Sequence, residues 1–463
     1  MAALGGCVEN QGTEGQSEGL TLYVAWGWGL DNPQSIIRTE PLLPPIFDGD
    51  GCMADLPRAL EPWSETFDQP VADCLARARR YGGWLWPNRP VVFISDPHAD
   101  AEGFLRSLIA AGVIGRNGGQ ITLTPFGRAA QIILGGDTLD KGPSNLVLLD
   151  AIAEVLDSGA EVTILAGNHD LRMLMAIGSV RGERHSLNEH LFVRMGRKIL
   201  PALREVLDRF VTLEDLAALP SEDVCKTRLM PAKDWADRFA VAARAEVRAP
   251  VITKEIRKLY EKLTKFETDR ARHNMTYREL LAALLKCHDI FLAPGGHYAW
   301  FYDRMQAVAR SGSLVFVHAG LCDHMATALA RDGVNAVNAA YRDAANRATL
   351  GFYFGPLANL VRTKYRKSDC TLTEEGVDLL QRAGLHMVVQ GHVNNNAGQR
   401  LLAKRGLLHL EGDITLDRAS RALEGLEGVG AGATLIFPSG DVIGLSCDHP
   451  RAKHFAPERM VAQ

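Results

Sequence analysis

Five short segments of this chain place oxygen or imidazole side chains directly after an apolar run. As candidate metal ligands they supply two aspartates, one asparagine and three histidines, and a further histidine, His169, is left over. Such ligands bind divalent cations, and this number suits two metal ions in one site, an arrangement typical of phosphate ester hydrolysis. The segments are Asp96-Pro97-His98, Gly136-Asp137-Thr138-Leu139-Asp140, Gly167-Asn168-His169-Asp170, His318-Ala319-Gly320 and Gly391-His392.

The apolar runs before these segments predict buried strands. The carboxyl ends of such strands meet at one edge of an open α/β sheet, so segments that are distant in sequence can form one site. In an extended stretch Asp96 and His98 would point the same way and chelate one metal. The runs are Val91 to Ile94, Ile132 to Leu134, Val162 to Ala166, Leu314 to Val317 and Met387 to Val389.

Residues 171–300 interrupt the alternation of strands and helices and predict a helical insertion. Ile256, Leu259, Leu263 and Phe266 form one apolar stripe at helical spacing. Thr276 and Glu279 match a capping box at a helix start. Two interpretations are open: a cap that only adds stability, or a lid that selects the substrate. We favour the lid, because it directly follows a site loop and such loops tend to carry function.

The domain plan predicted from this pattern has three parts. Residues 1–85 form an N-terminal extension that is partly disordered. Residues 86–450 form the catalytic domain, interrupted by the insertion, and residues 451–463 form a flexible tail. Five tryptophans are candidates to pack the extension against the main body: Trp26, Trp28, Trp63, Trp84 and Trp86.

Composition limits the classes of function. The 463 residues are 46% hydrophobic with a net charge of −4, so a large core is available and a general nucleic-acid signature is missing. The eight cysteines are scattered, which favours free thiols, and no run of 18 apolar residues predicts a membrane helix. We therefore expect a cytoplasmic protein. The motifs GxSxG, GxxxxGK[ST] and HExxH are also missing, which argues against serine hydrolases, P-loop NTPases and zincin proteases.

The order of the five segments resembles the calcineurin-like metallophosphoesterase superfamily. Residues 136–143 and 317–321 resemble the phosphoprotein phosphatase branch, with Lys141 where that family has Arg. Residues 167–171 resemble its bacterial diadenosine tetraphosphatase members, which share GNHD. The resemblance covers roughly residues 90–175 and 310–420. It implies an α/β fold, a two-sheet β-sandwich flanked by helices, whereas the residues alone predict only α/β with buried strands.

The resemblance also implies a role for each site residue. Asp96, His98 and Asp137 would hold one metal, and Asp137 would share the other with three further ligands, Asn168, His318 and His392. A hydroxide between the metals would attack phosphorus. His169 would protonate the leaving oxygen, oriented by Asp140, and Lys141 and Arg362 would bind phosphate oxygens. The metals would be Mn, Fe, Zn or Ni.

The expected activity is hydrolysis of a phosphate monoester, either a phosphoserine or phosphothreonine protein or a small phosphorylated molecule. The alternative is hydrolysis of a dinucleoside polyphosphate such as diadenosine tetraphosphate. A more remote alternative is an inactive scaffold with the same fold. The expected partner is thus a phosphorylated substrate, without membrane or nucleic acid, and the oligomeric state is left open.

Overall fold

Two β-sheets face each other at the centre of the described chain. The computed structural model describes residues 42–51, 58–63, 70–180, 183–347, 349–364 and 369–456. Residues from Leu43 onward belong to one compact unit. The predictions for residues 1–41, including Trp26 and Trp28, lie outside the described residues.

The larger sheet has eight strands and carries three of the five predicted site strands. Strands β2, β5, β6 and β7 run parallel, and β13 pairs antiparallel with β2. In order across the sheet the strands are β1 (Leu60–Pro62), β15 (Ala452–Phe455), β14 (Val442–Ser446), β13 (Gly432–Ile436), β2 (Val91–Ile94), β5 (Gln131–Leu134), β6 (Glu161–Leu165) and β7 (Met305–Gln306).

The smaller sheet has five strands and carries the other two site strands. Strand β10 pairs in parallel with both β9 and β12. In order, the strands are β11 (Arg400–Lys404), β12 (Leu407–Glu411), β10 (Met387–Gln390), β9 (Leu314–Phe316) and β8 (Ala309–Ser311). A separate two-stranded hairpin joins β3 (Ile114–Asn117) to β4 (Gln120–Leu123).

The core lies between the two sheets. Phe93 of β2 packs on Phe316 of β9 with ring centroids 6.0 Å apart, and both side chains are fully buried. The same cluster includes Val389 of β10 and Leu410 of β12. The two-sheet α/β sandwich that the resemblance implied is therefore confirmed.

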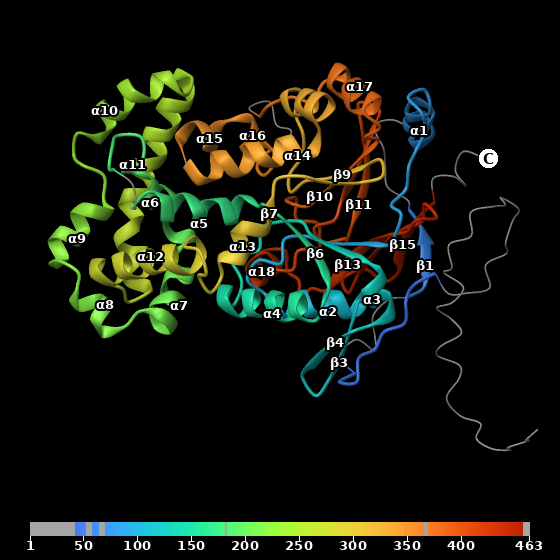
Figure 1. Ribbon diagram of the computed structural model, residues 1–463, viewed down its shortest axis with the longest axis horizontal. Helices are drawn as coiled ribbons and strands as arrows, with labels where there is room; N and C mark the ends of the chain where they lie inside the picture. Colours follow the sequence, from blue (N-terminus) through green and yellow to red (C-terminus); the bar gives the residue numbers. More distant parts are fainter. Residues whose placement is uncertain are drawn as a thin grey trace, which may run out of the picture. The chain divides into compact units, whose positions relative to one another are not determined.

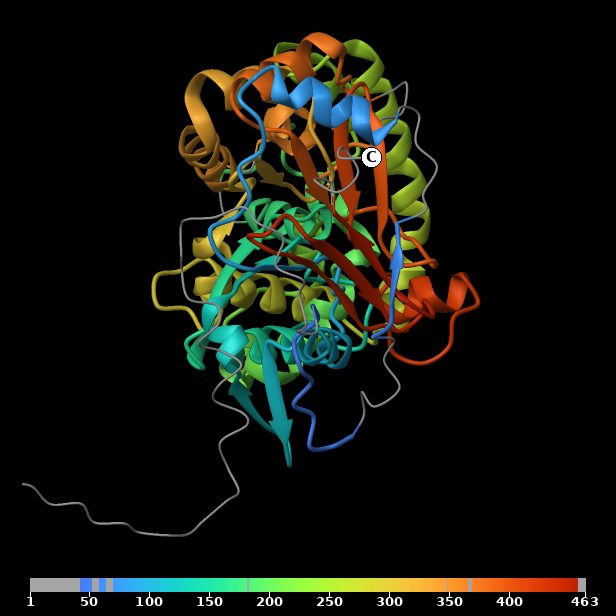
Figure 2. The same ribbon diagram turned by 90° about the vertical axis from the view of Figure 1, so that its right-hand side faces the viewer.

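Helices cover the outer faces of both sheets (Figure 1 and Figure 2). Helices α2 and α4 lie along the larger sheet, whereas α1, α14 and α17 lie along the smaller one. Helix α14 contains a break at Gly333, where φ is 80°. The helices outside the insertion are α1 (Val71–Arg79), α2 (Ala101–Ala110), α3 (Pro125–Ala129), α4 (Asn145–Asp157), α5 (Asn168–Gly178), α14 (Asp323–Arg347), α15 (Leu350–Phe354), α16 (Pro356–Asn359), α17 (Glu374–Arg382) and α18 (Arg418–Leu423).

All regular elements between residues 183 and 304 are helices, and we call this segment the cap. Figure 1 shows it at the left of the sheets. The capping box of Thr276 and Glu279 is present at the start of α12. The elements are α6 (Leu191–Met195), η2 (Gly196–Lys198), α7 (Leu200–Phe210), α8 (Leu213–Ala217), α9 (Glu222–Leu229), α10 (Trp235–Ala242), η3 (Ala243–Ala245), α11 (Ala249–Arg272), α12 (Tyr277–Phe291) and α13 (Ala299–Arg304).

The two ends of the described chain join the larger sheet, which differs from the predicted extension and tail. Ala452–Phe455, assigned to a flexible tail, form β15, which pairs antiparallel with β14 and parallel with β1. Ala452 and Phe455 are buried, so apolar packing holds this strand in place. Trp63 lies in the core cluster, and Trp84 and Trp86 pack against it, as the sequence indicated.

Candidate active site

The five predicted segments meet at the carboxyl ends of their strands. The loops after β2, β5 and β6 come from the larger sheet, and those after β9 and β10 come from the smaller one. An isolated bridge between Ser95 and Asp413 joins the two sheets beside this edge. Every predicted ligand is at most 2% exposed apart from Asn168, which is 8% exposed, and half-buried His392.

Asp137 lies at the centre of these side chains. Its Oδ2 atom is 3.7 Å from Nε2 of both His98 and His169. Its Oδ1 atom is 3.4 Å from Nε2 of His318. The Asn168 amide nitrogen donates to Asp137 Oδ2 at 2.7 Å and lies 3.4 Å from His392 Nδ1. One carboxylate thus faces the side chains of three other loops.

Two groups of possible ligand atoms share Asp137. One consists of His98, Asp137 and His169, and the other of Asp137, His318 and His392. Asp96 borders the first group, with Oδ1 3.9 Å from His98 Nε2. Asp137 is therefore the carboxylate common to both groups of possible ligand atoms.

The loop after β2 is not extended, so this part of the sequence prediction was wrong. Asp96 and His98 have φ angles of 57° and 45°, in the left-handed region that non-glycine residues rarely adopt. The backbone N–H groups of this loop instead form hydrogen bonds with carbonyl oxygens of the loop after β5. Asp96 N–H donates to Gly136 O at 3.1 Å, and His98 N–H donates to Asp137 O at 3.0 Å. This backbone pairing holds both side chains beside Asp137.

Asp170 ties two site loops together. Its carboxylate accepts N–H bonds from Gly167 at 2.9 Å and from Leu139 at 3.0 Å. Burial, together with the nearby charge of Asp137, raises the pKa of Asp170 to about 7. Gly167 is required at this junction, because a Cβ there would lie 1.8 Å from Asp137 N.

His169 and Asp140 form a pair next to Asp137. The His169 Nδ1 atom is 2.6 Å from Asp140 Oδ2, and Lys198 Nζ approaches the same oxygen at 3.4 Å. Burial opposes ionisation of Asp140, but the His169 hydrogen bond and charge outweigh it and lower the pKa of Asp140. If Nδ1 carries the proton shared with Asp140, Nε2 is the atom that faces the site.

Acidic and basic side chains surround Asp137 and shift one another's pKa values. Burial opposes the charge on Asp137, yet His318 and His169 hold its pKa well below the ordinary range. Burial likewise acts against protonation of His318, but Asp137 and Asp96 raise the His318 pKa to about 10. Burial raises the pKa of Asp96 to about 6. Buried carboxylates crowded with imidazoles form a donor set that suits cations.

The two predicted phosphate-binding residues occupy different surroundings. Lys141 Nζ lies 2.9 Å from His98 Nε2 and 3.5 Å from Asp417 Oδ2, so it reaches the cluster. The Arg362 guanidinium donates to Tyr353 O and lies over the Tyr353 ring at 4.4 Å.

Sequence reasoning missed two aspartates from the segment after β12. Asp417 Oδ2 is 3.9 Å from His98 Nε2. Burial raises the pKa of the Asp413 carboxyl, and the nearby charge of Asp96 raises it further. Asp413 follows the apolar run from Leu407 to Leu410 and Asp417 follows the one from Ile414 to Leu416, but neither lies in one of the five motif segments. Thr415, between them, has a φ of 56°, which turns this segment toward the site.

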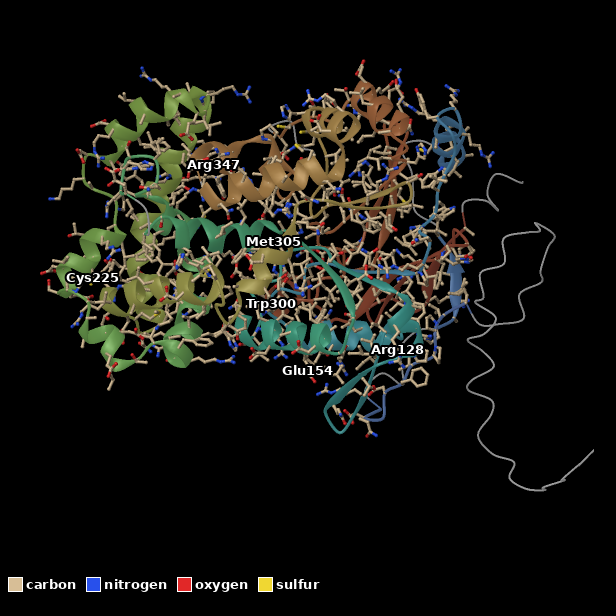
Figure 3. All side chains as sticks on the ribbon, viewed as in Figure 1. Arg128, Glu154, Cys225, Trp300, Met305 and Arg347 are labelled. Atoms are coloured by element: carbon tan, nitrogen blue, oxygen red, sulfur yellow. The ribbon has the colours of Figure 1, made fainter. Side chains whose placement is uncertain are left out.

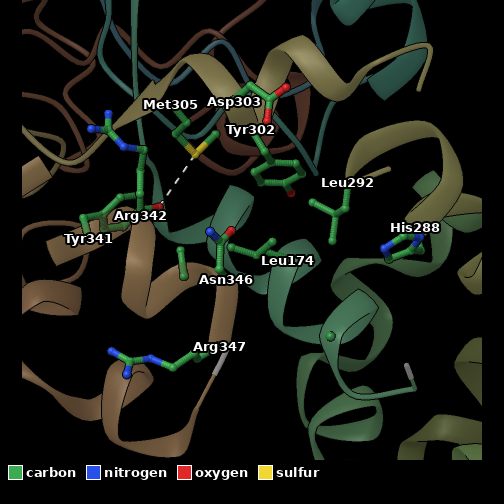
Figure 4. Close-up of a pocket in the computed structure, with 12 residues that line it drawn as sticks. Leu174, His288, Leu292, Tyr302, Asp303, Met305, Tyr341, Arg342, Asn346 and Arg347 are labelled. Atoms are coloured by element: carbon green, nitrogen blue, oxygen red, sulfur yellow. Dashed lines mark hydrogen bonds between the residues drawn. The ribbon is translucent and has the colours of Figure 1, made fainter. Parts of the chain in front are cut away.

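A cavity of about 510 Å³ lies elsewhere, between α5, α12, α13 and α14 (Figure 4). Met305 and Arg347, which both line it, are also labelled in Figure 3. Its α5 residues are Leu174 and Gly178, which the helical repeat places opposite His169 and Arg172. This cavity is therefore separate from the side chains that surround Asp137.

Comparison with known protein families identifies residues 89–231 as a calcineurin-like phosphoesterase sequence. The match makes this part of the chain similar to that superfamily. The matched residues contain the loops after β2, β5 and β6, so they include Asp96, Asp137 and His169. His318 and His392 lie beyond the match, and the fold brings them to the same cluster.

Solved structures similar to the chain include phosphatases. A cold-active protein tyrosine phosphatase aligns at 15% identity with a TM-score of 0.40, over 79% of this chain and 78% of that one. The protein of that name from Shewanella sp. aligns at 13% identity with a TM-score of 0.38, over 84% and 85%. A protein serine/threonine phosphatase from Saccharomyces cerevisiae, with similarity to human phosphatase PP5, aligns at 11% identity with a TM-score of 0.34, over 80% and 84%. No curated protein sequence matches the chain. None of the described helices has the length and apolar character needed to cross a membrane.

Proposed function

We propose that this protein is a phosphoesterase that binds two divalent metal ions and hydrolyses a phosphate monoester, of a phosphoserine or phosphothreonine protein or of a small molecule. The observation that carries the proposal is the pair of ligand groups that share Asp137, with the His169–Asp140 pair beside them. Residues 89–231 supply most of this site and match a family of the same chemistry.

The residues present fit two cations. Asp96, His98 and Asp137 would hold one, and Asp137, Asn168, His318 and His392 would hold the other. The Asn168 amide nitrogen lies 3.4 Å from both His318 Nε2 and His392 Nδ1, so these three side chains converge on one place. Rotation of the Asn168 amide by about 180° would present its oxygen where the nitrogen now lies. His318 donates Nδ1–H to Gly135 O at 2.7 Å, which orients Nε2 toward Asp137.

When bound, the metals would supply Lewis acidity, which polarises phosphate oxygens and makes water a nucleophile at neutral pH. The chain's own residues perform the proton transfer. His169 protonates the leaving oxygen through Nε2, while Asp140 stabilises its imidazolium form through Nδ1. Lys141 brings a positive charge to the cluster and binds a phosphate oxygen as a point charge rather than a bidentate fork. Arg362 keeps the same proposed role, although its observed contacts are with Tyr353.

A second candidate activity is hydrolysis of a phosphoanhydride in a dinucleoside polyphosphate. Lys198 of the cap lies beside Asp140 and favours this second activity, because its ammonium group adds positive charge next to the proposed proton donor. Both activities use the same ligands and the same proton donor.

The test is phosphate release from protein stripped of metal and reloaded with Mn²⁺, Fe²⁺, Zn²⁺ or Ni²⁺. Substrates are p-nitrophenyl phosphate, a phosphothreonine peptide and diadenosine tetraphosphate. Activity should require metal, and Asp137→Asn should lose both bound metal and turnover. Asp223→Asn, the same change on the exposed surface of the cap, is the matched control. Two metals per chain in Asp137→Asn by elemental analysis would contradict the shared-ligand assignment.

A further inference from the structure

Five cations gather where the cap meets α5, and we call them the cap basic cluster. They come from elements that pack against one another: α5 contacts α6, and α11 contacts both α6 and η2. Figure 1 shows α6 and α11 beside α5. The members are Arg172 of α5, Arg194 of α6, Arg197 and Lys198 of η2, and Lys262 of α11.

The cluster begins at the proposed proton donor. Lys198 Nζ lies 3.4 Å from Asp140 Oδ2, and the same oxygen lies 2.6 Å from His169 Nδ1. Arg172 follows His169 by three residues on α5, so the two side chains share one face of the helix. Positive charge therefore extends from His169 toward the cap.

Few anions offset this charge. Glu255 pairs with Arg194, with Oε1 2.5 Å from Nε, and Asp140 pairs with Lys198. Arg172 Nη1 is buried and has no hydrogen-bond partner in the part of the chain that the structure describes. A buried guanidinium nitrogen without an acceptor is costly and marks a place where an anion would be stabilised.

Lys262 is held inside the cluster. Its Nζ lies 3.7 Å and its Cδ 3.5 Å from the position that a Cβ at Gly196 would occupy. Burial, followed by the charges of Arg194 and Arg172, lowers the pKa of Lys262 to about 8. Repulsion among positive charges at a half-buried position is unfavourable, and a bound anion would offset it.

We propose that the cap basic cluster binds a second phosphate group carried by the leaving part of the substrate. This inference rests on the proposed function, in which His169 faces the leaving oxygen. In that reaction the oxygen of water bonds to phosphorus, the bond from phosphorus to the leaving oxygen breaks, and that oxygen takes a proton from His169. Whatever remains attached to the leaving oxygen then lies on the side of His169 where the cluster begins.

The second phosphate can be joined to the rest of the substrate by an ester bond or by an anhydride bond. Two pairs of substrates distinguish these linkages. We would compare kcat/KM of the Mn²⁺-loaded full chain for fructose 1,6-bisphosphate against fructose 6-phosphate, and for pyrophosphate against acetyl phosphate, an anhydride whose leaving part carries no phosphate. At least one member with the second phosphate should exceed its partner by tenfold or more. Preference within the sugar pair indicates an ester, and preference within the anhydride pair indicates an anhydride.

Lys262 and Lys265 provide a matched pair of variants, because both lie on α11 and Lys265 is exposed. Lys262→Met should lower the preference for the additional phosphate at least tenfold while keeping the length of the side chain. Lys265→Met should leave that preference unchanged. Equal ratios in wild type and Lys262→Met, or equal losses in both variants, would overturn the inference.

Calorimetric titration of the metal-free protein with inorganic pyrophosphate separates the two proposals. If wild-type protein hydrolyses p-nitrophenyl phosphate but shows no preference in either pair, the proposed function stands and the inference fails. If hydrolysis is missing but pyrophosphate binds and Lys262→Met weakens that binding tenfold, the anion site stands and the proposed function fails.

Discussion

The site loops and the cap are built in opposite ways. Of the ten non-glycine residues with positive φ in the described chain, seven lie in the loops that carry the candidate ligands, and one, Asn274, lies in the cap. The loops bury many charges close together and hold strained backbone, whereas the cap is made of regular helices whose buried side chains are mostly apolar. Strain of this kind persists only where surrounding contacts enforce it, and it concentrates at functional sites.

This difference predicts that the two regions respond to different measurements. Substitutions in the loops should change catalysis more than unfolding, because the side chains there mainly contact one another. Substitutions inside the cap should change unfolding first. Three variants test this division.

The largest effect is expected for His169→Asn. Loss of a positioned proton donor should lower kcat by roughly 10²–10⁴-fold on an ester with a poor leaving group. Metal content and melting temperature should stay near wild type, since the His169 N–H bond to Asp137 Oδ1 at 2.7 Å is made by the backbone. An unchanged rate on such an ester would show that His169 is not the acid.

A smaller effect, on stability, is expected for Glu255→Gln in the cap. Burial opposes the charge of this carboxylate, but His190 and Arg194 outweigh it and lower its pKa below the ordinary 4.5. Removing one partner of a buried ion pair should cost about 3 kcal/mol of unfolding free energy. Because the folded pKa is depressed, the difference from wild type should be complete above pH 4.5 and shrink as pH falls through the folded-state value. Denaturant unfolding of both proteins across this range provides the measurement, and a constant difference would contradict the assignment.

The smallest effect is expected for Arg257→Ala on the outer face of α11. Arg257 and Glu261 lie 3.7 Å apart, with side chains 70% and 64% exposed. Such a pair contributes less than about 1 kcal/mol, so neither turnover nor melting temperature should change measurably. A clear loss of stability would show that the outer surface of the cap is itself packed against something in solution.

The sequence predicted those parts of the molecule that depend on local pattern. Five apolar runs became strands, and Asp96, Asp137, His318 and His392 met at one edge, because strand ends gather in this kind of sheet. The positive φ of Asp96 and His98 could not be predicted, since it arises from hydrogen bonds to a loop forty residues away. The roles of Asp417 and Lys198 depend on long-range packing in the same way.

The short pairing of β1 with β15 has a practical consequence for handling the protein. Strand β1 forms one edge of the larger sheet, and it is three residues long and ends in Pro62, which has no N–H to donate. A short strand that ends in proline is a poor template for another chain. A version of the protein that begins after residue 62 would exchange this protected border for the bare edge of β15 and would be prone to aggregate through it.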